Sequence, residues 1–443
     1  MRINFVLLSL IYVLCTGIVY AGPNIQHWTQ ENGARVYYVE AKGLPLVDIQ
    51  LVFDAGSARD GDRFGIATMT SILLDKGAGE WNVEQIAQRL EGVGARLDTS
   101  VSRDSASLSL RSLTQPRILD VALDTAAKII SDPKFDQADF EREKNRVLTA
   151  IHRQKESPAA LAKMTYFNRL YGDHPYAHPS IGVDETVSAL KREDILSFFN
   201  EYYVSRNTMV VIVGDVNRAQ AELISEHLTA GMKAGKKPAG IPVVGYDKKQ
   251  NSEFIQFSST QTHIYSGMPA LKRGDANYFA LYVGNHILGG SGLVSRISEE
   301  IREKRGLAYS SHSYFSPLKQ QGPFTMGLQT RNDQATQALE VLNQTLDEFI
   351  QKGPSEKELE SAKKNITGGF VLRFDSNTKV ADYVAMIGYY GMPLDYLDTF
   401  SDKVNAVSRE QIVSAFQSQI GLDRFQTVLV GGDSKSSSEK TAN

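Results

Sequence analysis

An arginine and a tyrosine seven residues apart, Arg302 and Tyr309, are the side chains of this sequence best suited to chemistry. A guanidinium group and a phenol hydroxyl both donate hydrogen bonds, so together they can hold a carbonyl oxygen on which negative charge develops. Gly306, between them, suits the left-handed conformation that closes a helix. We therefore expect Arg302 near the end of a helix and Tyr309 at the start of a strand, both facing one cleft. The alternative is that Arg302 is a solvated helix residue and that Tyr309 packs.

A glycine-rich loop comes just before this helix, and it contains Gly289, Gly290 and Gly292. Glycine gives a backbone conformations that other residues rarely adopt, and Ser291 or Ser295 can cap the helix that follows. Three apolar residues of the helix are expected on one buried face: Val294, Ile297 and Ile301. From residue 308 to 315, small and aromatic residues alternate with serines, which is typical of a half-buried strand. The stretch therefore predicts a loop, a helix and a strand in succession.

The composition indicates a folded protein with substantial cores, because 42% of the 443 residues are hydrophobic. The formal net charge is −3, so no basic excess points to nucleic acid. Residues 1–21 combine Arg2, an apolar run and a small-residue end, which predicts a secretory signal peptide; a first transmembrane helix is the alternative. The single cysteine, Cys15, lies in that segment. A mature chain would therefore contain no thiol, which excludes disulfides and thiol catalysis.

The predicted elements follow the same order twice. In the first half, we expect strands at 35–39 and 47–53, helices at 65–75 and 83–91, two strands within 95–112, and helices at 117–131 and 137–154. In the second half, we expect a strand at 262–267, a helix at 276–288, the loop, helix and strand above, a strand at 324–330, and helices at 334–351 and 355–368. A closing helix and strand at 194–213 recur at 411–430. The offset between the halves is about 217 residues.

Such a duplication predicts an α+β fold of two homologous domains, each a β-sheet covered by helices, facing each other across a clam-like cavity. We expect the domains at 22–235 and 242–433, joined by a linker at 236–241 that contains Lys, Pro and Gly. The segment 157–201 is expected to be irregular and then helical. Residues 434–443, rich in Ser and Lys, are expected to form a disordered tail.

Residues 302–309 fit the pattern R-E-x-x-G-L-x-Y, and with it the sequence resembles the M16 family, which includes pitrilysin, insulinase and the mitochondrial processing peptidase. Two further motifs look like those of this family: Asn32-Gly33-Ala34-Arg35-Val36 and His174-Pro175-Tyr176. The resemblance covers nearly the whole mature chain and implies LuxS/MPP-like domains. In that family, the Arg and Tyr help to hold the substrate backbone and the oxyanion. The glycine-rich loop is thought to let an extended peptide approach.

Catalytic M16 members carry the inverted zinc motif H-x-x-E-H on a helix of the first half and a third ligand, a Glu, on a later helix. The helix that corresponds to the first of these is 65–78, whose glycines and apolar residues agree with the family. Thr68 and Ile72 occupy the two histidine positions, Ser71 the general-base position and Ala150 the third ligand position. The resemblance therefore implies a degenerate zinc site and no metal cofactor in this chain.

The histidines do not suggest a replacement site, because they are scattered: His27, His152, His174, His178, His227, His263, His286 and His312. His174 and His178 share a helical spacing, but Pro175 and Pro179 indicate a loop. We expect these two imidazoles to fix the loop by hydrogen bonds, with metal binding as the weaker alternative. His312 is expected to be a packed or solvated strand residue, unless it reaches the cleft of Tyr309.

A chain with the Arg/Tyr motif and without the zinc ligands resembles the non-catalytic subunit of the two-chain bacterial M16 peptidases. The resemblance implies a heterodimer, inactive as single chains, in which a partner subunit holds Zn and this chain offers Arg302 and Tyr309 to a peptide substrate. We expect secretion across the inner membrane into the periplasm of a Gram-negative bacterium, with no nucleic acid or membrane partner. Two alternatives stay open: an M16-fold scaffold or adaptor without a role in proteolysis, and a self-sufficient metallopeptidase with unrecognised ligands.

Overall fold

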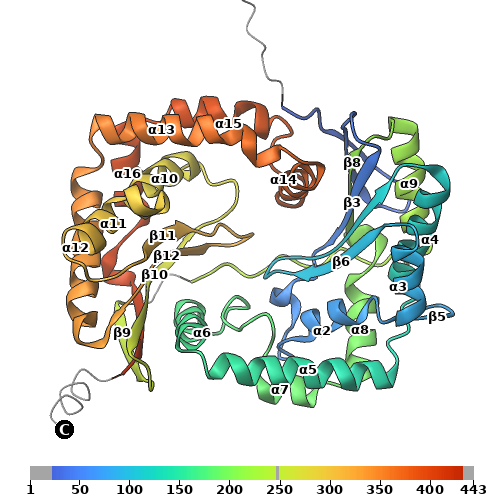
Figure 1. The fold of residues 1–443 in the computed structure, drawn as a ribbon, viewed down its shortest axis with the longest axis horizontal. Coiled ribbons are helices and arrows are strands. Elements are labelled where there is room, and N and C mark those ends of the chain that lie inside the picture. Colours follow the sequence, from blue (N-terminus) through green and yellow to red (C-terminus); the bar gives the residue numbers. More distant parts are fainter. Residues whose placement is uncertain (1–21, 246–248, 433–443) are drawn as a thin grey trace, which may run out of the picture.

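The computed structural model describes residues 22–245 and 249–432, which form two α+β units side by side (Figure 1). The predicted α+β class with two units is confirmed. The predicted signal peptide, 1–21, and the predicted tail, 434–443, lie outside the described residues. In the part of the chain that is described, no helix is long and apolar enough to cross a membrane.

A six-stranded sheet forms the N-terminal unit, with the strand order β1-β2-β8-β3-β7-β6. Its strands are β1 (Gln26–Thr29), β2 (Arg35–Glu40), β3 (Leu46–Phe53), β6 (Arg96–Val101), β7 (Ala106–Leu113) and β8 (Thr208–Gly214). β2 and β8 run parallel, and the other neighbours run antiparallel. β3 and β8 are buried on both faces; the sequence of β8 is apolar almost throughout, as such burial requires, whereas β3 also buries Asp48 and Gln50.

The helices of this unit cover one face of the sheet and share a hydrophobic core with it. They are α2 (Ile66–Leu73), α3 (Val83–Glu91), α4 (Pro116–Ser131), α5 (Gln137–Lys155), α7 (Asp184–Ala189), α8 (Arg192–Tyr202) and α9 (Arg218–Thr229). A short hairpin, β4 (Gly77–Ala78) and β5 (Trp81–Asn82), leads into α3. Asn82 caps α3 through a reciprocal pair of hydrogen bonds with Gln85, which explains the predicted start of that helix.

The C-terminal unit repeats this arrangement around a five-stranded sheet of order β11-β12-β10-β13-β9. Its strands are β9 (Asn251–Gln256), β10 (Gln261–Leu271), β11 (Ser311–Phe315), β12 (Gly322–Arg331) and β13 (Gln426–Gly431). β9 and β13 are parallel, as β2 and β8 are in the first unit. The same order of elements and the same parallel pair therefore confirm the internal repeat.

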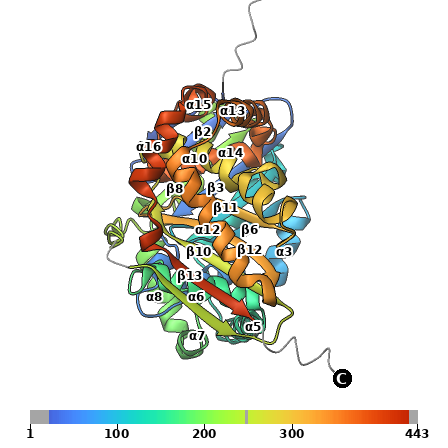
Figure 2. The same cartoon turned by 90° about the vertical axis from the view of Figure 1, so that its left-hand side faces the viewer.

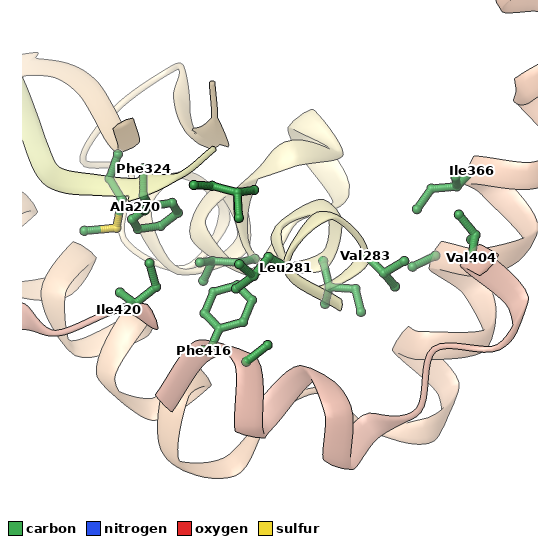
Figure 3. Close-up of a cluster of buried hydrophobic side chains, with 14 of the residues drawn as sticks. Ala270, Leu281, Val283, Phe324, Ile366, Val404, Phe416 and Ile420 are labelled. Carbon is green, nitrogen blue, oxygen red and sulfur yellow. The ribbon is translucent and has the colours of Figure 1, made fainter. Parts of the chain in front are cut away.

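Five helices build the core on the outer face of this second sheet: α10 (Tyr278–Asn285), α12 (Ala335–Lys352), α13 (Glu356–Phe370), α15 (Tyr396–Asn405) and α16 (Arg409–Gln419). Figure 2 looks at this unit from outside, with α12 and α16 toward the viewer. Leu281 and Val283 of α10 lie among buried side chains from the sheet and from the last helices, including Phe324 and Phe416 (Figure 3).

Two equivalent helices are exchanged between the units. α6 (Pro158–Tyr171) belongs to the first half of the chain, yet it packs on β10 and β13 of the second sheet (Figure 1). α14 (Asn377–Tyr390) belongs to the second half and packs on β3 and β8 of the first sheet. The prediction that segment 157–201 begins irregularly was therefore wrong, because α6 occupies its first turns with Ser157 as cap.

Close approach of backbone and side chain fixes both exchanged helices. The hydroxyl of Tyr166 in α6 donates to the carbonyl of Phe324 at 3.1 Å, above Gly267 of β10. A β-carbon on Gly267 would lie 2.4 Å from that hydroxyl. In α14, a β-carbon on Gly388 would lie 2.7 Å from the ring of Tyr37 in β2. Each helix thus sits against the opposite sheet at a distance that glycine alone permits.

Candidate functional site

The four positions where the family carries its zinc ligands and general base lie on α2 and α5, which pack against each other. The Thr68 hydroxyl donates to the carbonyl of Ser180 at 2.6 Å. Ser71 is buried, and its carbonyl accepts from the Thr99 hydroxyl at 3.1 Å. Ile72 packs against the core of the first unit, and Ala150 on α5 is half-buried.

These residues do not fit a zinc ion. Zinc takes nitrogen, sulfur or oxygen ligands, whereas Ile72 and Ala150 have no such side-chain atom and the Thr68 hydroxyl is already bonded to a carbonyl. Across residues 22–245 and 249–432, no three His, Cys, Asp or Glu side chains are grouped as metal ligands. The residues at these positions therefore serve the packing of α2 against α5 and not metal binding.

The start of α2 is held by a buried carboxyl group, Asp60. The N–H groups of Gly65 and Ala67 donate to its two oxygens at 2.7 and 3.1 Å. Burial raises the pKa of Asp60 to about 8, although these two donors act in the opposite direction. His178 lies 3.8 Å from Asp60 and stacks on Phe64 with ring centres 4.2 Å apart.

The two histidines with helical spacing lie in the loop between α6 and α7, as the prolines predicted. His174 Nε2 lies 2.8 Å from the carbonyl oxygen of Pro242, and the Tyr176 N–H donates to its Nδ1 at 3.1 Å. Burial lowers the pKa of both His174 and His178. The predicted role in fixing the loop by hydrogen bonds is confirmed for His174. His178, in contrast, is held mainly by its stack on Phe64 and bonds to the carbonyl of the adjacent Pro179.

The stretch that was predicted as a glycine-rich loop followed by a helix consists of four short helical turns. They are η3 (His286–Gly290), η4 (Gly292–Val294), α11 (Arg296–Ser298) and η5 (Glu299–Glu303), of which η3 and η5 are π-helical. The Ser295 side chain caps α11 by accepting from the N–H of Ser298. The predicted helix is therefore observed at residues 296–303, where η5 directly continues α11, but it begins only at this cap and its second part is π-helical. Wide π turns occur often at functional sites.

The cap also explains which predicted apolar residues are buried. Ile297 and Ile301, after the cap, are fully buried, whereas Val294, before it, is 86% exposed. The prediction that Val294 shares their buried face was therefore wrong. Its neighbour Leu293 is 62% exposed, so the turn presents two apolar side chains to solvent.

Each glycine of the loop has a different setting. Gly289 is buried against β11, where a β-carbon would lie 2.3 Å from the Ser313 Oγ and 2.5 Å from its backbone nitrogen. Gly290 is exposed and closes η3. Gly292 has a φ of +65°, in the left-handed region, with open space beside it. The loop is therefore packed against β11 at Gly289, whereas no described residue beyond its two chain neighbours contacts the side-chain position of Gly292.

Arg302 and Tyr309 are brought into contact, as their spacing suggested. The Arg302 Cζ lies 4.9 Å from the centre of the Tyr309 ring, and Gly306 between them has a φ of +61°. Tyr309 is 79% exposed and is therefore not a packed residue. It lies before the strand and does not open it, because β11 begins at Ser311.

The guanidinium group of Arg302 is only partly satisfied. Its Nε lies 3.3 Å from a carboxylate oxygen of Glu303, while Nη1 is buried and has no hydrogen-bond partner among the described residues. The pair thus combines an exposed tyrosine with a partly buried cation, one of whose donors is unused in this conformation. That is the composition expected of a site for a carbonyl or carboxylate oxygen.

A polar junction between the two units was missed by the sequence analysis. Its centre is Asp104, fully buried in the β6–β7 turn, whose carboxylate accepts from the Tyr176 hydroxyl at 2.5 Å, the Tyr390 hydroxyl at 2.8 Å and the Lys319 N–H at 2.8 Å. The Tyr389 hydroxyl donates to the Asp104 carbonyl at 2.6 Å. Burial, and then the nearby carboxylate, raise the pKa of Tyr176 and Tyr390. The junction joins segments that are more than 70 residues apart, so it cannot be predicted from a local sequence pattern.

Family models match both halves of the chain. The model described as insulinase (peptidase family M16) matches residues 35–183, and the model described as peptidase M16 inactive domain matches residues 189–366. Among solved structures, the peptidase M16 inactive domain from Pseudomonas fluorescens is 34% identical, with a TM-score of 0.89 over 92% of this chain and 98% of that chain. The chain therefore belongs to peptidase family M16.

Other relatives carry differing names. A chain of Helicobacter pylori named non-peptidase homolog YmxG is 27% identical over 90% of this chain and 92% of its own length. A chain of Bacillus subtilis named uncharacterized zinc protease YmxG is 24% identical over 88% of this chain and 94% of its own length. The crystal structure of a protease from Helicobacter pylori has a TM-score of 0.85 at 20% identity and so shares the fold.

Proposed function

We propose that this chain is the non-catalytic subunit of a zinc-dependent M16 peptidase, and that it presents Arg302 and Tyr309 to a peptide held against a zinc-bearing M16 partner. The observation that carries the proposal is the state of this pair: Tyr309 is 79% exposed and Arg302 has an unpartnered donor. The positions of the zinc ligands, in contrast, hold Thr68, Ile72 and Ala150. The similarity to a chain named non-peptidase homolog supports the absence of independent catalysis.

The chemistry assigned to this chain is stabilisation of an oxyanion. A peptide carbonyl gains negative charge when it is attacked, and a charged guanidinium and a phenol hydroxyl are donors that bind this oxygen more tightly as the charge grows. The guanidinium group lies over the Tyr309 ring, 4.9 Å from Cζ to the ring centre, so the two side chains are direct neighbours. Loss of one such donor costs roughly 10²–10³ in kcat in other hydrolases.

The exposed turn at residues 292–294, which precedes α11 in the chain, is suited to bind other residues of the peptide. Leu293 and Val294 lie in solvent between the free Gly292 and the capped start of α11. Exposed apolar side chains at one turn, beside backbone without side chains, form a surface for an extended chain. We assign to this loop the binding of substrate residues that flank the carbonyl held by Arg302 and Tyr309.

The proposed setting is the periplasm of a Gram-negative bacterium, and the proposed assembly is a heterodimer. The predicted signal peptide at residues 1–21 supports export, and the incomplete chemistry of each chain supports the pairing. No metal is assigned to this chain; zinc is assigned to the partner. The composition, with its net charge of −3, gives no reason to assign a nucleic acid partner.

The test is reconstitution. A tagged chain is purified from the periplasm, the copurifying M16 chain with an intact H-x-x-E-H motif is identified by mass spectrometry, and the pair is assayed on a quenched peptide. We expect the two chains to cleave the peptide only when they are combined. Arg302→Ala or Tyr309→Phe should lower kcat about 10²-fold while the complex stays intact. Arg305→Ala, which removes an exposed neighbour paired with Glu300, should leave kcat unchanged.

Three results would reject the proposal in different ways. Wild-type rates for both variants in an intact complex would favour a scaffold or adaptor role. Chelator-sensitive cleavage by this chain alone, with one tightly held zinc per chain, would favour a self-sufficient peptidase. Capture of no zinc-bearing M16 chain would remove the proposed partner.

A further inference from the structure

A cavity of about 240 Å³ opens beside Tyr309, on the face of the second sheet that α6 covers in part. Its polar wall is formed by His263, Tyr265, Ser310, His312 and Gln329, and Ser310 directly follows Tyr309 in the chain. Among the described residues, no Asp, Glu, Lys or Arg side chain lines it. The cavity is smaller than the roughly 300–1,000 Å³ of pockets that hold drug-sized ligands, so it suits a single side chain.

The strand register places the two histidines on the same face. His263 of β10 is opposite Gln329 of β12, and His312 of β11 is opposite Gly327 of β12. A β-carbon on Gly327 would lie 2.8 Å from the His312 Nε2. The imidazole of His312 therefore extends over the gap left by this glycine, across β12 and toward the strand that carries His263.

Both imidazoles are available to a ligand. Within residues 22–245 and 249–432, neither ring has a hydrogen-bond partner, and His312 is supported by stacking on Tyr314 with ring centres 5.6 Å apart. Burial lowers the pKa of His263 and His312, which favours the neutral imidazole with one N–H donor. Ala159, in the first turn of α6, also lines the wall. The N-terminus of a helix favours negative charge nearby.

We propose that this cavity is a specificity subsite, which accepts the carboxylate side chain of an aspartate or glutamate in the bound peptide. Imidazole N–H groups, a tyrosine hydroxyl and a glutamine amide can all donate to a carboxylate. A cationic side chain would find no carboxylate in the wall to pair with. The inference rests on the proposed function, since Arg302 and Tyr309 would hold the backbone of the same peptide next to the cavity.

The experiment measures peptide binding to the full mature chain by fluorescence anisotropy, with NMR of the histidine ring protons up to millimolar peptide. The probes are alanine-based dodecapeptides that carry one glutamate, moved through every position, and twins with glutamine instead. At one position we expect glutamate to bind about tenfold more tightly than glutamine, as for a hydrogen bond to a charged group. In a His263→Gln/His312→Gln variant this preference should vanish, while the affinity of the glutamine twin stays the same.

His227→Gln is the matched control, because His227 lies on α9 and pairs with Asp124, on the first unit. It should keep the glutamate preference. Equal affinity for both peptides at every position, or no binding up to millimolar peptide, would overturn the subsite. An Arg302→Ala chain separates the two proposals: weaker binding of all peptides without a glutamate preference supports the proposed function alone. A glutamate preference that Arg302→Ala leaves untouched, together with unchanged overall affinity, supports the subsite alone.

Discussion

The two halves of this protein use the same succession of elements for opposite purposes. In the first half, α2 and its surroundings are closed: Thr68 is bonded to a carbonyl, Ser71 is buried and Asp60 caps the helix. In the second half, the turns that lead to Tyr309 leave an exposed pair: Tyr309 lies in solvent, and the buried Nη1 of Arg302 has no hydrogen-bond partner among the described residues. The difference shows that one copy of a duplicated fold can be packed for stability while the other keeps unsatisfied groups, which are expected where a ligand binds.

The largest effect is expected where the glycine-rich loop packs against β11. Gly289→Val should reduce the free energy of unfolding by about 3 kcal/mol, because its β-carbon would meet the backbone and side chain of Ser313 within 2.5 Å. Urea denaturation measures the effect. Gly368→Ala in α13, where a β-carbon meets open space, is the control and should be neutral or stabilising. A Gly289→Val protein as stable as the wild type would show that the loop is not fixed to β11.

A comparable effect, dependent on pH, is expected in the first half, at Asp60. The pKa of Asp60 is raised from 3.8 to about 8 in the folded protein, so the folded state binds a proton there that the unfolded state has lost. The stability contributed by this group is therefore fully present below pH 4 and is lost as the pH rises toward 8. Between pH 5 and 8, the wild type should lose roughly 1.4 kcal/mol for each pH unit relative to Asp60→Asn, with the slope falling off as the pH nears 8.

The test compares how the free energy of unfolding of the two proteins changes with pH. The absolute values differ at every pH, because Asn also alters the two backbone hydrogen bonds. Asp62→Asn, an exposed neighbour, should give a curve parallel to that of the wild type. If the curve of Asp60→Asn is also parallel to that of the wild type, the carboxyl group is ionised in the folded protein. Water would then reach the start of α2 more than its burial implies.

Local patterns in the sequence predicted much of both sheets and their covering helices. The helix at 83–91 was placed at the observed bounds, because Asn82 and Gln85 supply a local cap. The exchanged helices were missed, α6 as an irregular segment and α14 altogether. Each of these helices packs against the sheet of the other unit, as Tyr166 packs over Gly267. The partner lies far away in the sequence, so neighbouring residues carry no signal of the contact.

For the candidate site, the sequence indicated the pair and the vacated metal positions but not their surroundings. The spacing of Arg302 and Tyr309 around Gly306 predicted their proximity, since a left-handed residue reverses the chain. The cavity beside them depends on strand register, which brings His263 and His312 to one face only after β12 is inserted between their strands. The sequence alone left His312 as a packed or solvated residue.

The smallest effect is expected at Tyr309, and it is the sharpest test of the second half. Tyr309→Ala should change the free energy of unfolding by no more than about 0.5–1 kcal/mol, because the recorded contact of this 79% exposed ring is its stack with Arg302, and exposed cation–π pairs contribute about that much. Tyr166→Ala, which empties a fully buried site, is the contrasting variant and should cost several kcal/mol. Thermal and urea unfolding of both proteins give the comparison. If Tyr309→Ala destabilises the chain by more than about 2 kcal/mol, the tyrosine is a packing residue, and its place beside Arg302 reflects folding rather than a role toward a peptide.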